Sequence, residues 1–212
     1  AWNYGAVVKR EGSKICNIEY ANLTQQPIKV EIETLYEHSY IKPVVTLKEV
    51  QPGESGKLQI ALQMMECPIW GPFEEKLYLV INGERKHTDE FAITLKADIR
   101  EDFSKMTVEE RQQAPIVEYT ATTNLGTIKN GKKIASKITL SNVGLNPLVI
   151  RRVISNDKGL NAYAPKSAIK GGKKADLKFD LNTANMAAGS YTRIITVITN
   201  DPAPSVIRLR VE

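Results

Sequence analysis

The sequence predicts an all-β protein that consists of two tandem β-sandwiches, and three observations lead to this prediction. The chain contains an internal repeat that spans almost its whole length, so one folding unit is present twice. Within each unit, short runs of alternating apolar and polar residues are separated by turn residues. No amphipathic helix of useful length interrupts these runs, and this combination is typical of a sandwich.

The internal repeat aligns two long stretches of the chain. The matched stretches are ICNIEYANLTQQPIKV (15–30) with SKITLSNVGLNPLVI (136–150), and VQPGESGKLQIAL (50–62) with IKGGKKADLKFDL (169–181). Asn22 falls on Asn142, 120 positions later. In the second stretch, alternate positions are apolar in both copies, and this period of two is the signal of a half-buried strand. The positions are Leu58, Ile60 and Leu62 in the first copy and Leu177, Phe179 and Leu181 in the second.

The ends of the repeat predict a first domain at residues 1–100, a linker at 101–116 and a second domain at 117–212. In the linker, Thr107 is followed three residues later by Glu110, which is the pattern of a capping box. Good helix formers follow, and a proline ends the run. A helix of about two turns is therefore predicted, and it should pack on a domain because so short a helix is marginal alone.

Length, composition and charge set the class of protein. The 212 residues suit two domains, and the hydrophobic fraction of 42% supports globular cores. Residues 1–115 carry 14 Lys and Arg against 18 Asp and Glu, a net charge of −4, whereas residues 116–212 carry 15 against 6, a net charge of +9. This asymmetry fits an anionic partner for the second half, attraction between the halves, or two solvated surfaces, of which we favour the last.

The segment ECPIWGPFEE, residues 66–75, looks more like a functional site than any other segment. Its copy in the repeat is ANMAAGSYTR, residues 184–193, which keeps the glycine but has no Cys, Pro or Trp. We therefore interpret the segment as a rigid turn before a strand, with Trp70 as a candidate partner contact. Cys67 has acidic neighbours where a reactive thiol needs basic ones. It also lies too far along the chain from the strand opposite Cys16, so two free thiols are predicted, with Cys16 buried.

Clustered lysines in the second half raise the question of anion binding. Lys170, Lys173 and Lys174 surround one turn and are candidate partner contacts. Lys132 and Lys133 follow a different turn, which we expect at the opposite end of the sandwich. A strand of about seven residues spans roughly 23 Å, more than the Debye length of about 8 Å at physiological salt, so the clusters should not act as one patch. Aromatic residues are not interleaved with them, and we predict no specific nucleic-acid binding.

Catalytic and metal-binding patterns are sparse in this sequence. The two histidines, His38 and His87, do not occur in a recognised ligand spacing. The stretch from Ser155 to Lys158 fits Ser-x-x-Lys, but the companion Lys-Thr-Gly is absent, and a sandwich turn replaces the helix start that this motif requires. We therefore predict that the protein is not an enzyme and that it has no catalytic residue, cofactor or metal site.

Two stretches of the second unit resemble a known family. LGTIKNGKKIASKITLSNVGLNPLVIRRV and IKGGKKADLKFDLNTANMAAGSYTRIITVITNDP are similar to the bacterial immunoglobulin-like family catalogued as domain of unknown function 1573, which is related to Hydin-type sandwich domains. The first unit, with WNYGAVV, QPGESGKLQIAL and WGPFEEKLYLVING, looks like a diverged copy. The resemblance implies two tandem seven-stranded immunoglobulin-like β-sandwiches joined by the short helical linker, export into the cell envelope, and no established enzymatic activity. Many members carry a Ser-Cys-Gly-Cys motif where this chain reads Ser155-Asn156-Asp157-Lys158, so a metal or redox role of that cysteine pair does not carry over.

Three functions stay open at the level of sequence. The leading one is a non-catalytic protein of the cell envelope, periplasmic or extracellular, that binds or scaffolds another macromolecule, either a protein or a glycan. We expect it to be a monomer, with peripheral association with the envelope as a further option. The second is a periplasmic pilus-type chaperone, which would donate an edge strand from FAITLKADI, residues 91–99, where apolar residues alternate weakly. The third is a hydrolase that uses acidic residues, which needs two carboxylates facing each other across a cleft.

Overall fold

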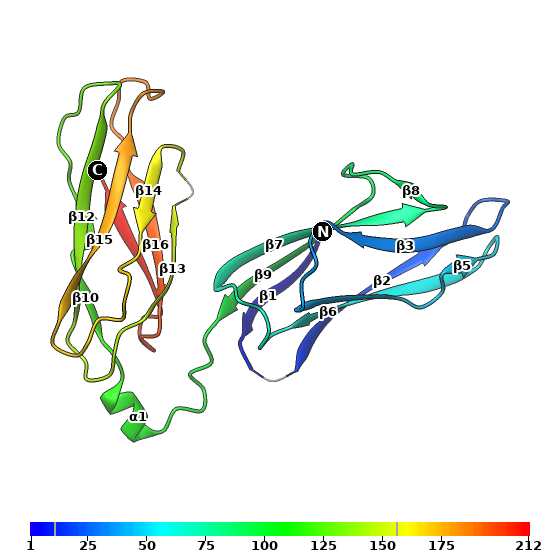
Figure 1. The fold of residues 1–212 in the computed structure, drawn as a ribbon, viewed down its shortest axis with the longest axis horizontal. Coiled ribbons are helices and arrows are strands. Elements are labelled where there is room, and N and C mark those ends of the chain that lie inside the picture. Colours follow the sequence, from blue (N-terminus) through cyan, green and yellow to red (C-terminus); the bar gives the residue numbers. More distant parts are fainter. Residues whose placement is uncertain (11, 156) are drawn as a thin grey trace. The chain divides into compact units, whose positions relative to one another are not determined.

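The computed structural model describes residues 1–10, 12–155 and 157–212, and it divides the chain into two compact units, Ala1–Asp102 and Phe103–Glu212. Both units are built almost entirely from β-strands (Figure 1). Among the described residues, no helix is long and apolar enough to cross a membrane.

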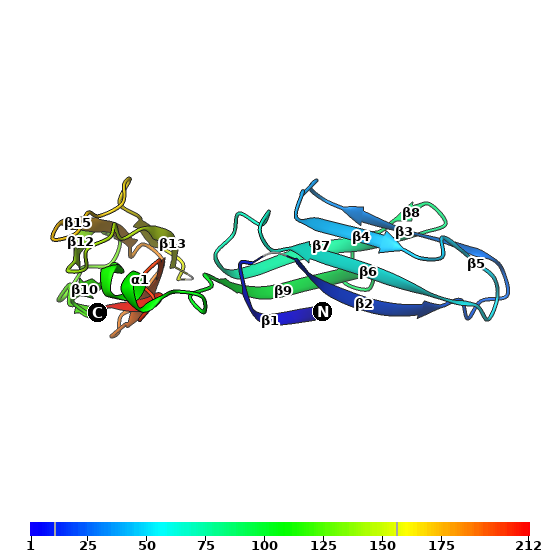
Figure 2. The same ribbon diagram turned by 90° about the horizontal axis from the view of Figure 1, so that it is seen from below.

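The first unit is a pair of facing sheets (Figure 2). One sheet has the order β1-β9-β7-β3-β5, with β8 paired to β7, and the other has the order β2-β6-β4. The strand β1 runs parallel to β9, whereas the other pairs in this unit are antiparallel. The strands are β1 (Trp2–Val8), β2 (Ser13–Ala21), β3 (Ile28–Thr34), β4 (Ile41–Val45), β5 (Glu49–Val50), β6 (Ser55–Gln63), β7 (Gly71–Ile81), β8 (Glu84–Arg85) and β9 (Ala92–Arg100).

The second unit repeats this plan with one helix ahead of it. One sheet has the order β10-β12-β15-β14, and the other has the order β11-β17-β16-β13. As in the first unit, the short strand β11 runs parallel to the last strand, β17. The elements are α1 (Val108–Gln113), β10 (Val117–Tyr119), β11 (Thr122–Thr123), β12 (Lys133–Asn142), β13 (Ile150–Ser155), β14 (Leu160–Tyr163), β15 (Lys174–Asn182), β16 (Arg193–Thr199) and β17 (Val206–Val211).

The strand numbers differ from the seven expected for each unit. Along the described residues, the first unit has nine strands and the second has eight. Several of the additional strands are only two residues long, namely β5, β8 and β11. Two residues carry no alternation that could be read from a sequence, so such strands are defined only by the neighbour with which they pair.

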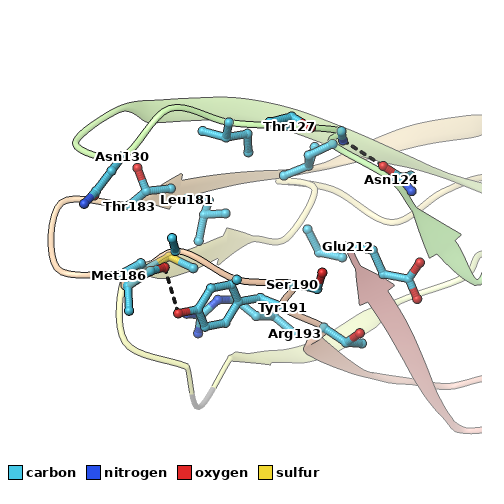
Figure 3. Close-up of a pocket in the computed structure, with 18 residues that line it drawn as sticks. Asn124, Thr127, Asn130, Leu181, Thr183, Met186, Ser190, Tyr191, Arg193 and Glu212 are labelled. Atoms are coloured by element: carbon cyan, nitrogen blue, oxygen red, sulfur yellow. Dashed lines mark hydrogen bonds between the residues drawn. The ribbon is translucent and has the colours of Figure 1, made fainter.

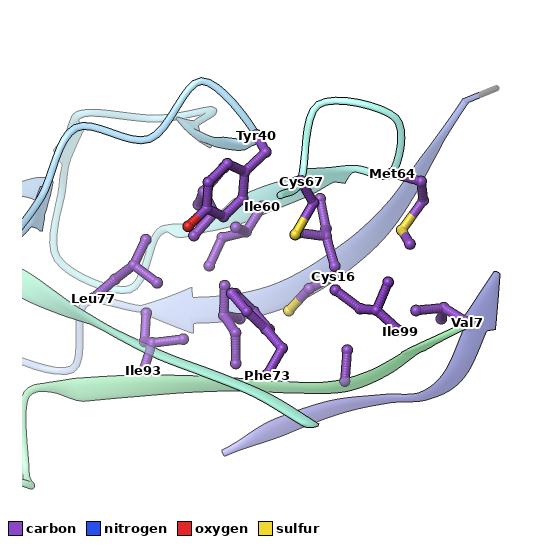
Figure 4. Packing of buried hydrophobic residues seen from close by; sticks show 14 of the residues in the cluster. Val7, Cys16, Tyr40, Ile60, Met64, Cys67, Phe73, Leu77, Ile93 and Ile99 are labelled. Carbon is purple, nitrogen blue, oxygen red and sulfur yellow. The ribbon is translucent and has the colours of Figure 1, made fainter. Parts of the chain in front are cut away.

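Alternation along the strands builds the core of the first unit. On β2, Cys16 is fully buried and Ile18 packs against the core. Asn17 and Glu19, which alternate with them along the strand, are exposed. The core draws side chains from both sheets, including Ile60 of β6 and residues of β7 and β9 (Figure 4). The second unit follows the same rule, with a core that includes residues of β12, β15, β16 and β17. Each unit is therefore a sandwich held by its own apolar interior.

The strand β9 departs from the expectation of weak alternation. Ile93, Leu95, Ala97 and Ile99 are all buried and alternate with polar or charged residues. In addition, β9 is paired on both sides, with β7 on one edge and β1 on the other. It is therefore an interior strand of its sheet and not an edge strand.

A buried asparagine ties together the crossing from β2 to β3. Asn22 is 1% exposed, and its side-chain Nδ2 donates to the carbonyl oxygens of Gln26 at 2.7 Å and Val50 at 2.9 Å. Its backbone N–H donates to the carbonyl of Glu54 at 2.9 Å, and its own carbonyl accepts from Gly53. The residue thus joins three separate stretches of backbone.

The same network recurs in the second unit. Asn142 is also 1% exposed, and its Nδ2 donates to the carbonyl oxygens of Asn146 and Ile169, both at 2.8 Å. Its backbone N–H donates to the carbonyl of Lys173 at 2.9 Å, and its carbonyl accepts from Gly172. The turn that the two sequence copies share is therefore built by the same set of contacts.

The segment around α1 packs on the second unit. The predicted capping box is present, with the Thr107 hydroxyl accepting from the Glu110 N–H and the Glu110 carboxylate accepting from the Thr107 N–H. After the helix, the chain passes so close to Gly144 that a Cβ there would lie 2.3 Å from the carbonyl oxygen of Ala114. The N–H of Ile116 also donates to the Asn142 side-chain oxygen. The contacts explain why Phe103 onward belongs to the second compact unit.

Removing either buried asparagine should destabilise its own unit. In the Asn142→Ala variant, two carbonyls lose their donor, and each unsatisfied buried group costs about 1–3 kcal/mol. We expect Asn22→Ala to act in the same way on the first unit. Chemical denaturation of the full chain, with one tryptophan or tyrosine signal followed for each unit, measures the change.

The matched control is Asn17→Ala, because the side chain of Asn17 lies on the exposed side of β2. This substitution should change the free energy of unfolding by less than about 0.5 kcal/mol. Equal effects of the buried and exposed substitutions would contradict the role given to the asparagine network.

The two thiols should be unreactive in the folded protein. Cys16 and Cys67 are both fully buried and free, and burial raises the pKa of each thiol; for Cys67 this outweighs the nearby Lys9 ammonium. A thiol reagent at pH 8 should react slowly with the native chain and with two thiols once denaturant is added. Because the folded-state pKa is raised, the stabilisation is complete below the ordinary value of about 8.5 and is lost as pH rises above it. Melting curves from pH 7 to 10 measure this loss of stability. A fast reaction of either thiol in the native chain would contradict the prediction that both are unreactive.

Candidate functional site

The first candidate partner contact, Trp70, is partly covered by its own unit. It lies in the loop before β7 and is only partly exposed. The Lys9 ammonium is 4.2 Å from the centroid of its ring, which is a cation–π distance, and the same ammonium donates to the carbonyl oxygen of Cys67. Gly71, which follows, has a φ of +75°, a conformation that favours glycine. The loop is thus a clamped turn whose special residues hold its shape.

The three candidate lysines surround one turn of the second unit. Lys170, Lys173 and Lys174 are all exposed, and the Lys173 N–H closes the turn on the Lys170 carbonyl at 3.0 Å. In the pairing of β12 with β15, Lys133 lies opposite Asn182, at the far end from Lys174. The two lysine clusters therefore lie at opposite ends of this strand pair. The candidate lysines belong to the second unit, whereas Trp70 belongs to the first.

Binding of anionic polymers by these lysines should be weak. We expect the chain to elute from a heparin column well below about 0.3 M salt, because contacts of exposed lysines to a polyanion depend steeply on ionic strength. The double variant Lys173→Glu with Lys174→Glu should shorten the retention further. Retention that survives 0.3 M salt and is lost in the double variant would show a specific site instead.

A pocket that the sequence did not point to lies at one end of the second sandwich (Figure 3). Its volume is about 810 Å³, within the range of about 300–1,000 Å³ that is usual for ligand pockets. Three stretches of chain form it: residues 124–130 ahead of β12, residues 183–192 between β15 and β16, and the end of β17. Its apolar wall is made by Leu125, Ile128, Leu181, Met186 and Val211.

The cation of the pocket lining, Arg193, points inward. It is the first residue of β16 and shares its side of the strand with Ile195 and Val197, which are fully buried. Its side chain is 13% exposed, and its Nη1 lies 3.0 Å from an Asp157 carboxylate oxygen. Its Nε is buried and has no hydrogen-bond partner among the described residues. A buried donor left without an acceptor is costly, at about 1–3 kcal/mol, and marks a position where a ligand can be accommodated.

Tyr191 covers this arginine. The guanidinium carbon of Arg193 is 5.5 Å from the centroid of the Tyr191 ring, and the Tyr191 hydroxyl donates to the carbonyl oxygen of Ala187 at 2.9 Å. The tyrosine is 41% exposed and belongs to a loop of small residues. The ring therefore lies within cation–π distance of the arginine, and among the described residues one hydrogen bond of its side chain holds it.

The corresponding end of the first unit is filled. The repeat places Ile69 and Trp70 at the positions of Ala187 and Ala188. Ile69 packs against the core of the first unit, and neighbouring Cys67 is fully buried in it (Figure 4). In the second copy these two positions carry the smaller alanines, and both line the pocket.

The other titratable residues named from the sequence lie in separate parts of the fold. In the ranges that the structure describes, no group of three His, Cys, Asp or Glu side chains is arranged to hold a metal. His87 pairs with Glu33 at 2.9 Å, and this hydrogen bond lowers the pKa of Glu33. In the Ser-x-x-Lys stretch, the Ser155 hydroxyl oxygen is buried whereas Lys158 is exposed, and Asn156 lies outside the described residues.

The sequence contains one indication of this pocket, although the pocket was not predicted from it. In RIITVIT, residues 193–199, every second residue counted from Arg193 points to the inside of the sandwich, so Arg193 occupies an inward position like Ile195 and Val197. An arginine at an inward position of a sandwich strand is unusual, because charged residues are rarely buried without a partner or a function. The cavity itself could not be predicted in this way, because the small residues that line it, such as Ala187 and Ala188, are common in any sequence.

A comparison with protein families matches the second unit. Residues 115–212 match the family model described as HYDIN/CFA65/VesB-like, Ig-like domain. The match supports an immunoglobulin-like family for this part of the chain. No curated protein matches the sequence.

Comparison with solved structures supports the fold over the whole chain. A protein of unknown function from Porphyromonas gingivalis has a TM-score of 0.63 at 19% identity, over 97% of this chain and 92% of that one. At this identity the likeness shows the fold alone. Lower TM-scores of 0.37, both at 10% identity, are found for PapD-like domain 7 of human CEP192, over 52% of this chain and 90% of that one, and for the Vibrio cholerae VesB protease, over 89% and 62%.

Proposed function

We propose that this chain is a non-catalytic protein of the cell envelope, periplasmic or extracellular, that binds or scaffolds another macromolecule. Its two units are proposed to be tandem immunoglobulin-like modules of the type catalogued as domain of unknown function 1573. The repeated asparagine network supports this relation between the units, because Asn22 and Asn142 make equivalent contacts. The protein acts as a monomer in this proposal, and its partner is another protein of the envelope.

The observation that carries the proposal is the pocket at the end of the second sandwich. It combines an apolar wall with an inward arginine whose Nε has no hydrogen-bond partner among the described residues. Such a combination is typical of recognition sites, in which an apolar surface gives affinity and a few polar groups give specificity.

The chaperone alternative loses its main structural requirement. A pilus-type chaperone that used FAITLKADI, residues 91–99, would need that segment as a free edge to which a client strand could be added. In this protein the segment is largely β9, and β1 already occupies its outer edge through the parallel pairing of Trp2 with Leu95 and Val7 with Ile99. Binding through this strand would first require the release of β1.

Co-sedimentation with envelope fractions tests the proposed function. The purified chain should bind saturably to solubilised envelope proteins of the source cells, and binding should weaken when the pocket is filled by Ala188→Trp. The matched control is Lys166→Met, a substitution at an exposed site of the same unit that should leave binding unchanged. Turnover of a glycan or peptide substrate by the wild-type chain, or the absence of saturable binding to any envelope fraction, would overturn the proposal.

A further inference from the structure

We infer that the pocket around Arg193 binds the free carboxyl terminus of a partner polypeptide whose last residue is aliphatic. The inference rests on the proposed binding function and names the ligand chemistry of that site. Its basis is the side-by-side arrangement of one hydrogen-bond donor and one apolar wall within a single cavity of about 810 Å³.

The arginine selects a carboxylate. Arg193 uses Nη1 for the Asp157 carboxylate at 3.0 Å, whereas its Nε has neither a hydrogen-bond partner among the described residues nor access to water. A ligand oxygen that accepts from Nε would satisfy this donor, and a charge-assisted hydrogen bond of this kind is about twice as strong as a neutral one. An uncharged acceptor, such as an amide carbonyl, would gain less.

The apolar wall selects the group next to the carboxylate. Leu181, Met186 and Val211 line the same pocket as the arginine. The ligand must therefore present a carboxylate and an aliphatic group close together. In a polypeptide, this arrangement occurs at the chain terminus, where the carboxylate and an aliphatic side chain are attached to the same Cα. The Asp and Glu side chains end in their carboxylate and carry no aliphatic branch beside it.

The rim of the pocket suits an extended backbone. Gly126, Gly189 and Ser190 are lining residues with small or no side chains, so a peptide main chain can approach their backbone groups closely. Capture of a terminal carboxylate beside exposed backbone groups is one of the recurring modes of peptide recognition. The residues before the terminus would therefore leave the pocket along this rim.

Entry of the ligand requires Tyr191 to move. Its ring lies over the guanidinium, and its hydroxyl donates to the carbonyl oxygen of Ala187, which is its one hydrogen bond in the part of the chain that the structure describes. The small residues at 187–190 give the loop freedom to shift the ring. When the ring moves, Nε becomes available to the carboxylate, and the aliphatic side chain of the ligand takes the space against the apolar wall.

One carboxylate of the lining opposes this ligand. Glu212 directly follows β17, and among the residues that line the pocket it carries the single acidic side chain. Its negative charge should weaken the binding of any anion by Coulomb repulsion. Neutralising it by Glu212→Gln should therefore tighten binding, whereas a ligand without charge would not respond.

Nuclear magnetic resonance titration of the full chain tests the inference. The probe is the peptide acetyl-Gly-Ser-Gly-Leu-Leu with a free carboxyl terminus, compared with the same peptide as a C-terminal amide. The free acid should shift the Nε–Hε resonance of Arg193 and bind at least tenfold more tightly than the amide. Equal binding of the two peptides would overturn the inference, as would octanoate that binds as tightly as the free acid.

Variants separate the role of the pocket from that of the fold. Arg193→Lys keeps the positive charge but removes the Nε donor, and it should reduce affinity for the free acid at least tenfold. If that variant unfolds, Ala188→Trp adds a large side chain to the pocket lining without changing Arg193 and should abolish binding, whereas Lys166→Met should not change it. Unchanged affinity in the Ala188→Trp variant would contradict the assignment.

The outcome can be distinguished from a failure of the proposed function. Loss of peptide binding with intact saturable binding to envelope proteins would overturn this inference alone. Peptide binding without any binding to envelope proteins would leave the pocket chemistry standing and overturn the proposed function.

Discussion

A buried asparagine is the contact on which each sandwich depends. At Asn22 and at Asn142, the chain leaves one sheet and crosses to the other, so several backbone carbonyls face the interior and not water. The asparagine amide supplies two donors to such carbonyls in each unit. Aspartate has no donor when ionised and serine has one, so neither could satisfy both acceptors. The side-chain type is thus dictated by the crossing, and this explains why the repeat keeps it at both positions.

Much of the fold could be predicted from the sequence, because alternation and turn chemistry act locally. The inward position of Cys16 and the capping box of Thr107 follow from patterns only a few residues long. The interior position of β9 could not be predicted in the same way. It depends on the parallel pairing with β1, whose residues lie more than 80 positions earlier in the chain. Contacts between strands so distant in sequence leave no local signal.

The candidate site was less accessible to sequence analysis. Trp70 and Cys67 drew attention because they are rare residue types, yet the structure uses them to fill and clamp one end of the first sandwich. Ala187 and Ala188, at the matching positions of the second sandwich, line its pocket. The sequence shows that these residues are small but not that they lie beside a cavity. The rare residue types thus lie at one end of the first sandwich, whereas the pocket of the second sandwich is lined by small and common residue types.

Both units place a pair of one acidic and one basic side chain at the same position, with the two members exchanged. In the first unit, Glu75 occupies the inward position that Arg193 holds in the second, and His38 lies 3.5 Å from it, in the segment after β3. Asp157, the partner of Arg193, comes from the equivalent segment after β13. Such pairs cost desolvation energy and seldom stabilise a fold on balance, so fold stability alone does not explain their presence in both copies.

The surroundings of the two pairs differ in a way that bears on function. In the first unit, Tyr40 stacks on His38 with ring centroids 4.7 Å apart and packs edge-on against Phe73, so aromatic rings enclose the pair. In the second unit, the tyrosine at the position of Phe73 is Tyr191, which covers Arg193 from an exposed loop. One fold therefore presents a closed end with a negative inward group and an open end with a positive one. At both ends a buried nitrogen lacks a hydrogen-bond partner among the described residues, His38 Nε2 in the first unit and Arg193 Nε in the second. Arg193 also lines a pocket, and our proposal therefore places recognition in the second unit.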